Sequence, residues 1–334
     1  MSWRLTNAAL AMLLASAGAG AAAEAPLQIC DVTDQCALAL KWTVDGEFKK
    51  DKDLSGLACA TPTACIMVTD EEDKAQLFTL DSDNHVLRTG ERVKLPVDGG
   101  EEIDAEAVAY ADGAYVIVGS HGAKRHSDGT LDLASFNIYR LPVDPASGKI
   151  ELARIERASL RDAIRNAESP LRDFAEQPLP QGANIEGIAI ERDVIYAGFR
   201  APSKEAQAFV LPVKQVFGGT PTPGPLLPLP LGAETGIRDM AAVPGGWVVL
   251  AGPVDQDGDF SLYAWQGGSA VTRLGSLRNP PQRIKDGEVR VGKAEGLLYL
   301  GTTDTTDAQS WRFLVIFDDA EQGAPYEVWV PAPG

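Results

Sequence analysis

The sequence predicts an all-β protein that folds as a β-propeller with about five four-stranded blades. The first observation is a repeat, because five segments share one pattern of polar and apolar residues and begin roughly 50–57 residues apart, with one step of about 80. The second is that strand-like runs rich in Val, Ile, Tyr and Phe follow each segment, separated by turn residues. A repeat of about 50 residues holding four strands is typical of one blade. The segments are DLSGLA at 53–58, DAEAVA at 104–109, NIEGIA at 184–189, GIRDMA at 236–241 and KAEGLL at 293–298.

Each repeat supplies the strands of its blade in the same order. The motif is followed by a second apolar run such as AYVIVGS or WVVLAGP, and then by a third such as QAFVLPV. A more polar fourth run often ends the unit. Residues 36–44 could pair with residues 326–331 and close the ring. The blade count is five if the terminal runs join existing blades, and six if they build one of their own.

The long step between the second and third repeats predicts a helical insertion. Residues 158–177 combine helix-forming residues with apolar side chains at helical spacing, interrupted by Pro170. We expect one or two short helices here. Residues 219–231 hold five prolines, which favours an outer edge strand or an extended loop over a central strand.

Residues 1–23 have the features of a signal peptide that is removed on export. Arg4 gives a basic start, residues 8–19 are a short apolar stretch, and residues 21–23 offer an A-x-A cleavage site. The apolar stretch is shorter than the ~18–20 residues that a membrane span needs. We therefore expect a periplasmic or secreted protein in which residues 24–334 form a single propeller domain.

The four cysteines fit an oxidising compartment, where they can pair. Cys30 and Cys36 have the same spacing as Cys59 and Cys65, and each pair brackets a short polar loop. The local pairing Cys30–Cys36 and Cys59–Cys65 is preferred over the other connectivities. The sequence contains no C-x-x-C motif, which disfavours thioredoxin-like redox chemistry and a cysteine zinc site.

The charge disfavours nucleic acids and membranes as partners. Thirty Lys and Arg residues stand against forty-seven Asp and Glu residues, which gives a formal net charge of −17. Such a surface repels phosphate backbones and anionic lipids. The expected partners are a small polar or anionic molecule or another periplasmic protein, and we expect a monomer.

The repeats resemble a family of exported bacterial proteins known only as a domain of unknown function. The resemblance runs from residue 53 to about residue 318, and Ala107 departs from it because the other glutamate repeats have glycine there. It implies a propeller fold. A more distant similarity to phytase-like esterase propellers concerns the fold and implies no reaction. The motifs that carry it are Asp53-Leu54-Ser55-Gly56-Leu57, Asp104-Ala105-Glu106 with Gly119-Ser120-His121, Asn184-Ile185-Glu186-Gly187 with Gly198-Phe199-Arg200, Gly236-Ile237-Arg238-Asp239, and Lys293-Ala294-Glu295-Gly296.

The repeated motif predicts a ring of polar side chains at one mouth of the central channel. The first strand of each blade lines the channel, so equivalent positions of successive blades meet there. The third position of the motif contributes Ser55, Glu106, Glu186, Arg238 and Glu295. The candidate ligand-binding residues are Asp53, Asp104, Glu106, Glu186, Arg200, Arg238, Asp239, Lys293 and Glu295.

Such a ring allows three functions. The main expectation is binding of a small polar or charged ligand, with a divalent cation such as calcium held by Glu106, Glu186 and Glu295 as the cofactor alternative. A second reading is a protein-interaction scaffold whose channel residues form a purely structural network.

The third reading is a phytase-like or lactonase-like hydrolase, that is, a phosphoesterase or lactonase. Its catalytic residues would be His121 as general acid or base, with Glu106 to orient it, and Glu186. The basic run Lys124-Arg125-His126 could receive an anionic group. The sequence has no G-x-S-x-G motif, phosphate-binding loop, dinucleotide fingerprint or H-E-x-x-H motif, so it leaves open whether the protein is an enzyme.

Overall fold

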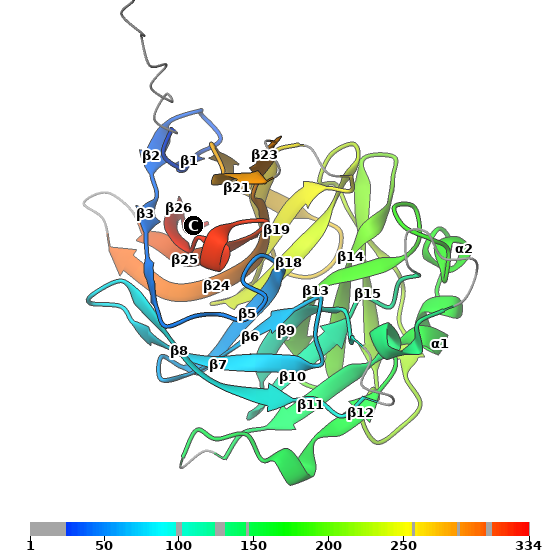
Figure 1. The fold of residues 1–334 in the computed structure, drawn as a ribbon. Helices are drawn as coiled ribbons and strands as arrows, with labels where there is room; N and C mark the ends of the chain where they lie inside the picture. The colour runs from blue at the N-terminus through cyan, green and yellow to red at the C-terminus, as the bar shows by residue number, and fades with distance from the viewer. Residues whose placement is uncertain are drawn as a thin grey trace, which may run out of the picture.

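Five sheets surround a central channel as propeller blades in this computed structural model (Figure 1). The structure describes residues 25–97, 102–123, 131–144, 147–255, 258–285, 288–304 and 309–333. Each innermost strand contacts the innermost strand of the next blade, and the last contacts the first, so the ring is closed. The prediction of a five-bladed propeller is confirmed, and the terminal strands join existing blades.

Blades 1 and 2 are antiparallel meanders that run outward from the channel. Blade 1 consists of β5 (Leu54–Thr61), β6 (Ala64–Thr69), β7 (Lys74–Asp81) and β8 (Val86–Lys94). Blade 2 consists of β9 (Ala105–Ala111), β10 (Ala114–Gly119), β11 (Ile138–Pro142) and β12 (Glu156–Ala158), with the 3-10 turns η1 (Leu133–Phe136) and η2 (Leu152–Arg154) between its outer strands.

Blades 3 to 5 repeat this plan with changes at their outer edges. Blade 3 consists of β13 (Asn184–Glu191), β14 (Val194–Lys204) and β15 (Gln207–Lys214), and the proline-rich segment adds β16 (Thr222–Pro223) and β17 (Leu227–Leu229) at its edge, as predicted. Blade 4 consists of β18 (Thr235–Val243), β19 (Gly246–Pro253), β20 (Phe260–Trp265) and β21 (Val271–Arg278). Blade 5 consists of β24 (Lys293–Asp304), β25 (Gln309–Asp318) and β26 (Tyr326–Pro331), preceded by the hairpin β22 (Gln282–Lys285) and β23 (Glu288–Val291), with the 3-10 turn η3 (Glu321–Gly323) before β26.

The position of a strand in its blade explains its sequence. All six residues of β10 are buried, because neighbouring blades cover both of its faces, and its sequence is the apolar run AYVIVG. Strand β8 lies further out, and only Leu87 and Val93 of its nine residues are buried, in keeping with its more polar sequence VLRTGERVK. The core consists of hydrophobic clusters between adjacent blades.

The first described strands complete blades formed by later parts of the chain. Strand β1 (Gln28–Cys30) pairs with β21, β2 (Cys36–Leu38) pairs with β1, β3 (Leu40–Lys41) pairs with β26, and β4 (Thr43–Asp45) pairs with β8. Trp42 is buried between these strands, and its Nε1 donates to Glu327 Oε2 at 3.0 Å. The predicted pairing of this segment with residues 326–331 is confirmed at β3.

Both predicted disulfides are present, as are the predicted helices. Cys30 is bonded to Cys36 across the β1–β2 hairpin, and Cys59 to Cys65 across the β5–β6 hairpin. Helices α1 (Arg161–Arg165) and α2 (Leu171–Phe174) pack against blades 2 and 3. Disulfides are expected of an exported protein.

The predicted signal peptide at residues 1–23 lies outside the described residues. In the described part of the chain, none of the helices has the length and apolar character that crossing a membrane requires.

Candidate functional site

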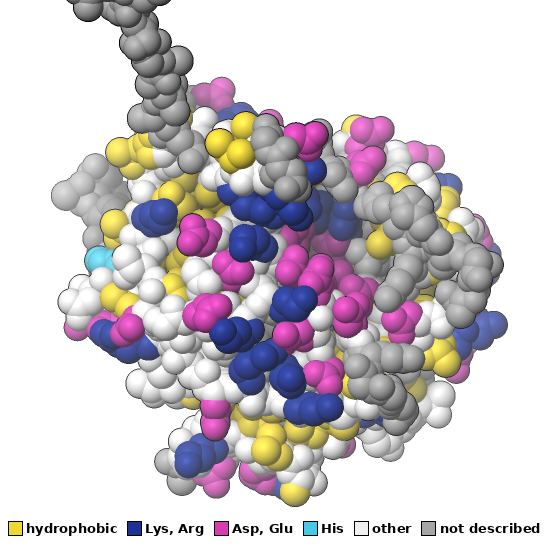
Figure 2. Space-filling view, in the orientation of Figure 1, with side chains coloured by type: hydrophobic (Ala, Val, Ile, Leu, Met, Phe, Trp, Pro, Cys, Tyr) yellow, Lys and Arg dark blue, Asp and Glu magenta, His cyan; other side chains and the backbone are white. Residues whose placement is uncertain are grey.

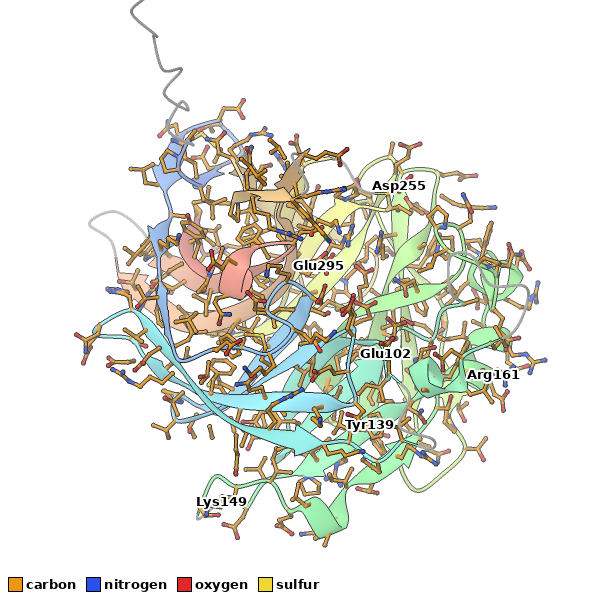
Figure 3. All side chains as sticks on the ribbon, viewed as in Figure 1. Glu102, Tyr139, Lys149, Arg161, Asp255 and Glu295 are labelled. Carbon is orange, nitrogen blue, oxygen red and sulfur yellow. A yellow bond between two sulfur atoms is a disulfide. The ribbon has the colours of Figure 1, made fainter. Side chains whose placement is uncertain are left out.

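The site is the channel mouth, which we define as the start of the five innermost strands together with the ends of the second strands. In Figure 2, acidic side chains gather near the centre of this face and Lys and Arg side chains lie around them. Figure 3 places Glu295 close to that centre. The mouth divides into two groups of side chains with different partners.

The first group, the arginine network, consists of Glu186, Arg200, Arg238 and Glu295. Arg238 is fully buried, and its Nη1 lies 3.0 Å from Glu186 Oε2 and 2.8 Å from Glu295 Oε1, so it joins blades 3, 4 and 5. Arg200 Nη1 donates to Glu186 Oε1 at 2.6 Å. Two further donors reach backbone, with Arg238 Nη2 bound to Pro253 O at 2.6 Å and Arg200 Nε to Val254 O at 2.8 Å, whereas the buried Arg238 Nε has no hydrogen-bond partner among the described residues. These contacts satisfy two carboxylates with two guanidinium groups.

The network fixes the charge of Glu186. Burial by itself would raise the pKa of this carboxyl, but the positive charges of Arg200 and Arg238 outweigh burial and lower the pKa. Asn184 Nδ2 also donates to Glu186 Oε1, at 2.8 Å. Glu186 is therefore an ionised carboxylate whose oxygens are already bound, which explains how a glutamate is tolerated within an otherwise apolar inner strand.

The negative charge of Glu295 is less fully compensated by basic groups than that of Glu186. Burial, together with the charge of Asp318, raises its pKa to about 8, even though Arg238 opposes the shift. The nearby Lys293 directs its Nζ to Asp318 Oδ2 at 2.8 Å and lies 3.5 Å from Asp319 Oδ2. Lys293 stands two residues before Glu295 and brings a third basic group to the mouth, but Asp318 at the end of β25 and the following Asp319 largely neutralise it.

The second group, the acidic cluster, consists of Asp53, Asp70, Asp104 and Glu106 from blades 1 and 2. Burial, followed by the charge of Glu71, raises the pKa of Asp53 to about 6. Burial, followed by the charge of Asp104, raises the pKa of Asp70 to about 9. Burial, followed by the charges of Glu186 and Asp104, also raises the pKa of Glu106 well above its usual range. The cluster is therefore short of positive charge.

Hydrogen bonding confirms the difference between the two groups. Asp70 Oδ1 is buried and has no hydrogen-bond partner among the described residues. Asp104 accepts a hydrogen bond from the Ser120 hydroxyl, and its backbone oxygen accepts from Ser120 N at 2.9 Å. No Lys or Arg in the described ranges forms an ion pair with Asp70 or Glu106.

Sequence reasoning missed Asp70 and Asp318 as members of the mouth. Both follow the apolar run of a second strand, at the end of β6 and of β25. The sequence contains a signal for both, since Arg200 occupies the corresponding position at the end of the second apolar run in blade 3. Applying the same position to every blade would have found both aspartates.

Asp239 has a different environment from the other candidate residues. It is buried, and its two carboxyl oxygens accept from Met240 N and Leu297 N, each at 2.7 Å. It therefore ties the inner strand of blade 4 to the backbone of blade 5. In blades 3 and 5 the same motif position is glycine, and a Cβ at Gly296 would overlap Ile316 and Leu57, so these inner strands approach too closely for a larger residue.

His121 is placed where it cannot exchange protons with a ligand in the channel. Its side chain is buried, its Nδ1 lies 2.8 Å from Gly119 O, and its Nε2 accepts from Leu160 N at 2.9 Å. Both ring nitrogens are thus used by backbone groups, and burial lowers the pKa of the imidazole to about 4. Glu106, the expected orienting partner, does not bond to it. His121 instead attaches the helical insertion to blade 2.

Replacing His121 with alanine should lower the free energy of unfolding at pH 7 by about 2–4 kcal/mol, because it leaves a cavity and unpaired backbone groups. The stabilisation by the neutral imidazole is also pH-dependent. It is complete above the unfolded pKa of 6.5 and is lost as the pH falls through about 4. Urea unfolding at pH 7 and pH 4.5 measures both effects. A His121→Ala protein with unchanged stability at pH 7 would contradict this structural role.

The remaining predicted features have no counterpart at the described mouth. Lys124, Arg125 and His126 lie outside the described residues. Within the described ranges, no group of three or more His, Cys, Asp or Glu side chains is arranged to hold a metal ion, and Glu186 and Glu295 are bound to Arg238 instead.

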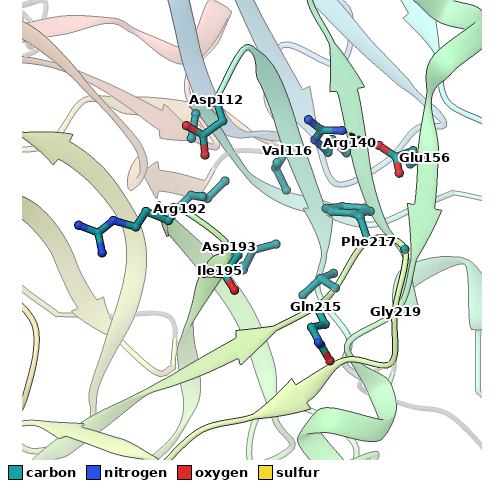
Figure 4. Close-up of a pocket in the computed structure, with 14 residues that line it drawn as sticks. Asp112, Val116, Arg140, Glu156, Arg192, Asp193, Ile195, Gln215, Phe217 and Gly219 are labelled. Atoms are coloured by element: carbon teal, nitrogen blue, oxygen red, sulfur yellow. Dashed lines mark hydrogen bonds and ion pairs between the residues drawn. The ribbon is translucent and has the colours of Figure 1, made fainter.

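A separate cavity of about 460 Å³ lies between blades 2 and 3, away from the mouth (Figure 4). Its wall includes the ion pair between Arg140 Nη1 and Glu156 Oε1, at 2.6 Å, and the ring of Phe217. No residue of the arginine network or the acidic cluster lines it. It is therefore not part of the predicted site.

Comparison with known proteins gives a family match and several solved propellers. No curated protein matches the chain. Solved structures similar to it include the periplasmic gluconolactonase of Pseudomonas aeruginosa, with 11% identity, a TM-score of 0.38 and coverage of 87% of this chain and 76% of that one. A gluconolactonase of Xanthomonas campestris has 13% identity, a TM-score of 0.35 and coverage of 96% and 90%, and the major allergen Mala s 1 of Malassezia sympodialis has 11%, 0.41, and coverage of 90% and 84%. Likenesses this low carry no argument about chemistry.

The family match covers the first part of the propeller. Residues 53–168 match the model described as "Protein of unknown function (DUF3616)". This range contains blades 1 and 2 and helix α1. The resemblance noted in the sequence is thus confirmed over these residues, and the family to which it points is one of unknown function.

Proposed function

We propose that the protein binds a small molecule that carries a positive charge, and that the acidic cluster at the channel mouth receives this charge. The observation that carries the proposal is the difference in ion pairing between the arginine network and the acidic cluster. In the arginine network Glu186 is paired with two guanidinium groups and Glu295 with one, whereas Asp70 and Glu106 have no basic partner among the described residues.

A cation would resolve the unfavourable electrostatics of the cluster. Asp70 and Glu106 are half-buried, and burial together with the like charges of their neighbours raises the pKa of both carboxyl groups, so a positive group close to them favours their ionised form. A hydrogen-bond donor on that group would also satisfy the buried Asp70 Oδ1. A primary ammonium or a guanidinium group supplies both the charge and the donors.

The described part of the mouth gives less support to an anionic ligand. Arg200 and Arg238 are already bound to Glu186, and Lys293 is bound to Asp318. An anion would have to compete with these carboxylates and would add to the negative charge nearby.

Titration calorimetry with ethylamine, guanidinium, calcium and phosphate tests the proposal. Binding of ethylamine or guanidinium should release protons, because Asp70 and Glu106 ionise when the cation arrives. The apparent affinity should therefore rise with pH from about 6 to about 9. Repeating the titration in buffers with different ionisation enthalpies measures the proton release.

Two variants and one control identify the site. Asp70→Asn and Glu106→Gln should each weaken ethylamine binding by at least about tenfold, which is the loss of about 1.4 kcal/mol of charge-assisted interaction. Asp83→Asn removes an exposed carboxylate from a turn of blade 1 and should leave binding unchanged. Binding of phosphate without binding of either cation would overturn the proposal.

A further inference from the structure

A second pocket lies further along the central channel, beyond the mouth. We call it the distal pocket. It has a volume of about 220 Å³, and all five innermost strands contribute to it. Its lining residues follow the polar positions of the motif by two to four residues, which places them roughly 7–13 Å further along each strand. Each innermost strand contributes three consecutive residues, as β13 does with Ile188, Ala189 and Ile190, and Trp247 of β19 completes the lining.

The distal pocket contrasts with the mouth in its chemistry. No charged side chain lines it, although the mouth of the same channel is crowded with carboxylates. Three aromatic residues lie in its wall, namely Tyr110, Trp247 and Tyr299. Tyr110, Ile190 and Tyr299 are partly exposed and Ala242 is exposed, so the pocket is open to solvent.

The repeat explains why this space is not filled by the protein itself. Protein interiors contain few voids larger than a water molecule. Here four of the five blades place alanine at the sixth position of the motif, as Ala58, Ala109, Ala189 and Ala241, and the fifth places Leu298. Side chains with the usual core volume at these positions would occupy the channel. The small side chains at the sixth position of the motif therefore leave this space open, and the aromatic residues form part of its wall.

We propose that the distal pocket binds a neutral aromatic molecule of one or two rings. Cavities on the order of 150 Å³ accept a benzene ring in other proteins, so the volume of this pocket, about 220 Å³, is large enough for the ligand. The uncharged lining selects against an ionised ligand, which would lose its hydration without gaining a partner. Stacked or edge-on contacts with Tyr110, Trp247 and Tyr299 would favour an aromatic ring over an aliphatic one.

Indole is a suitable probe, and calorimetric titration of the whole protein measures its binding directly. Benzoate, which carries a charge on a similar ring, serves as the matched negative control. We expect indole to bind with one site per chain and benzoate to bind at least about tenfold more weakly. This binding does not depend on the acidic cluster, so Asp70→Asn should leave it unchanged.

Variants that fill the pocket provide the decisive test. Ala189→Leu should reduce indole binding by at least about tenfold, but Ala189 is buried and the change could disturb folding. Ala242→Leu alters an exposed alanine at the rim and should reduce binding in a folded protein, as checked by its melting temperature. Ala233→Leu, at an exposed position outside the pocket, is the control. The proposal is overturned if wild-type protein does not bind indole, or if folded Ala242→Leu protein binds it as tightly as Ala233→Leu protein.

Discussion

Replacing Arg238 with methionine is expected to lower the free energy of unfolding by about 3–5 kcal/mol, because it leaves buried carboxylates without their partner. Arg238 is fully buried and bonds to Glu186 and Glu295 and to the backbone oxygen of Pro253. Methionine fills much of the same volume but offers none of these donors. Urea unfolding at pH 7 measures the loss.

Two comparisons separate the network from a general effect of losing an arginine. Arg154→Met removes an exposed ion pair, in which Arg154 Nη1 lies 2.8 Å from Glu151, and should cost less than about 1 kcal/mol. Adding Glu186→Gln and Glu295→Gln to Arg238→Met should recover part of the loss, because the uncompensated charges disappear with them. Equal destabilisation by Arg238→Met and Arg154→Met would show that the network contributes little.

Alkaline pH is expected to weaken the fold, and Asp70→Asn should remove part of this effect. In the folded protein the pKa of Asp70 is raised to about 9, whereas an unfolded aspartate titrates near 3.8. Between these values the folded state binds more protons than the unfolded state, so stability falls as the pH rises. At pH 9 the asparagine variant should be more stable than wild type by about 1–3 kcal/mol, because asparagine carries no charge, whereas Asp70 begins to ionise beside other carboxylates.

Thermal unfolding at pH 5 and pH 9 measures this difference. The melting temperature of Asp70→Asn should exceed that of wild type by roughly 2–8 °C at pH 9 and should be close to it at pH 5. The exposed change Asp83→Asn serves as the control and should follow wild type at both values. If the three proteins lose stability equally between pH 5 and pH 9, Asp70 does not carry the raised pKa.

The repeated motif made the fold predictable, because the same order of strand-like runs and turn residues recurs in every blade. It also predicted which side chains meet, since equivalent positions of successive blades must surround the channel, as Glu186, Arg238 and Glu295 do. It could not predict how these side chains share their partners. That Arg238 bridges two blades while Asp70 has a buried oxygen without a partner depends on side-chain conformations that no spacing determines.

The hydrogen-bond partners of His121 could not be predicted from the sequence either. Its position after a second strand makes it a candidate general acid or base in the sequence, with Glu106 as the expected orienting partner. Its actual partners are the backbone of Gly119 and of Leu160, which is 39 residues away. Such a contact depends on where the helical insertion packs against the blade. The sequence predicts the helices but not the position at which they pack.

The strands β1, β3 and β4 also set the order in which the propeller can assemble. Residues 28–45 belong to three different blades, two of which are formed by strands later than residue 235. The early blades can form from local hairpins, but the N-terminal segment must wait until the last blade exists before Trp42 can reach Glu327. Contacts of such long sequence separation form slowly. Ring closure is therefore expected to be the slowest step of folding, with residues 28–45 among the last parts of the described chain to dock.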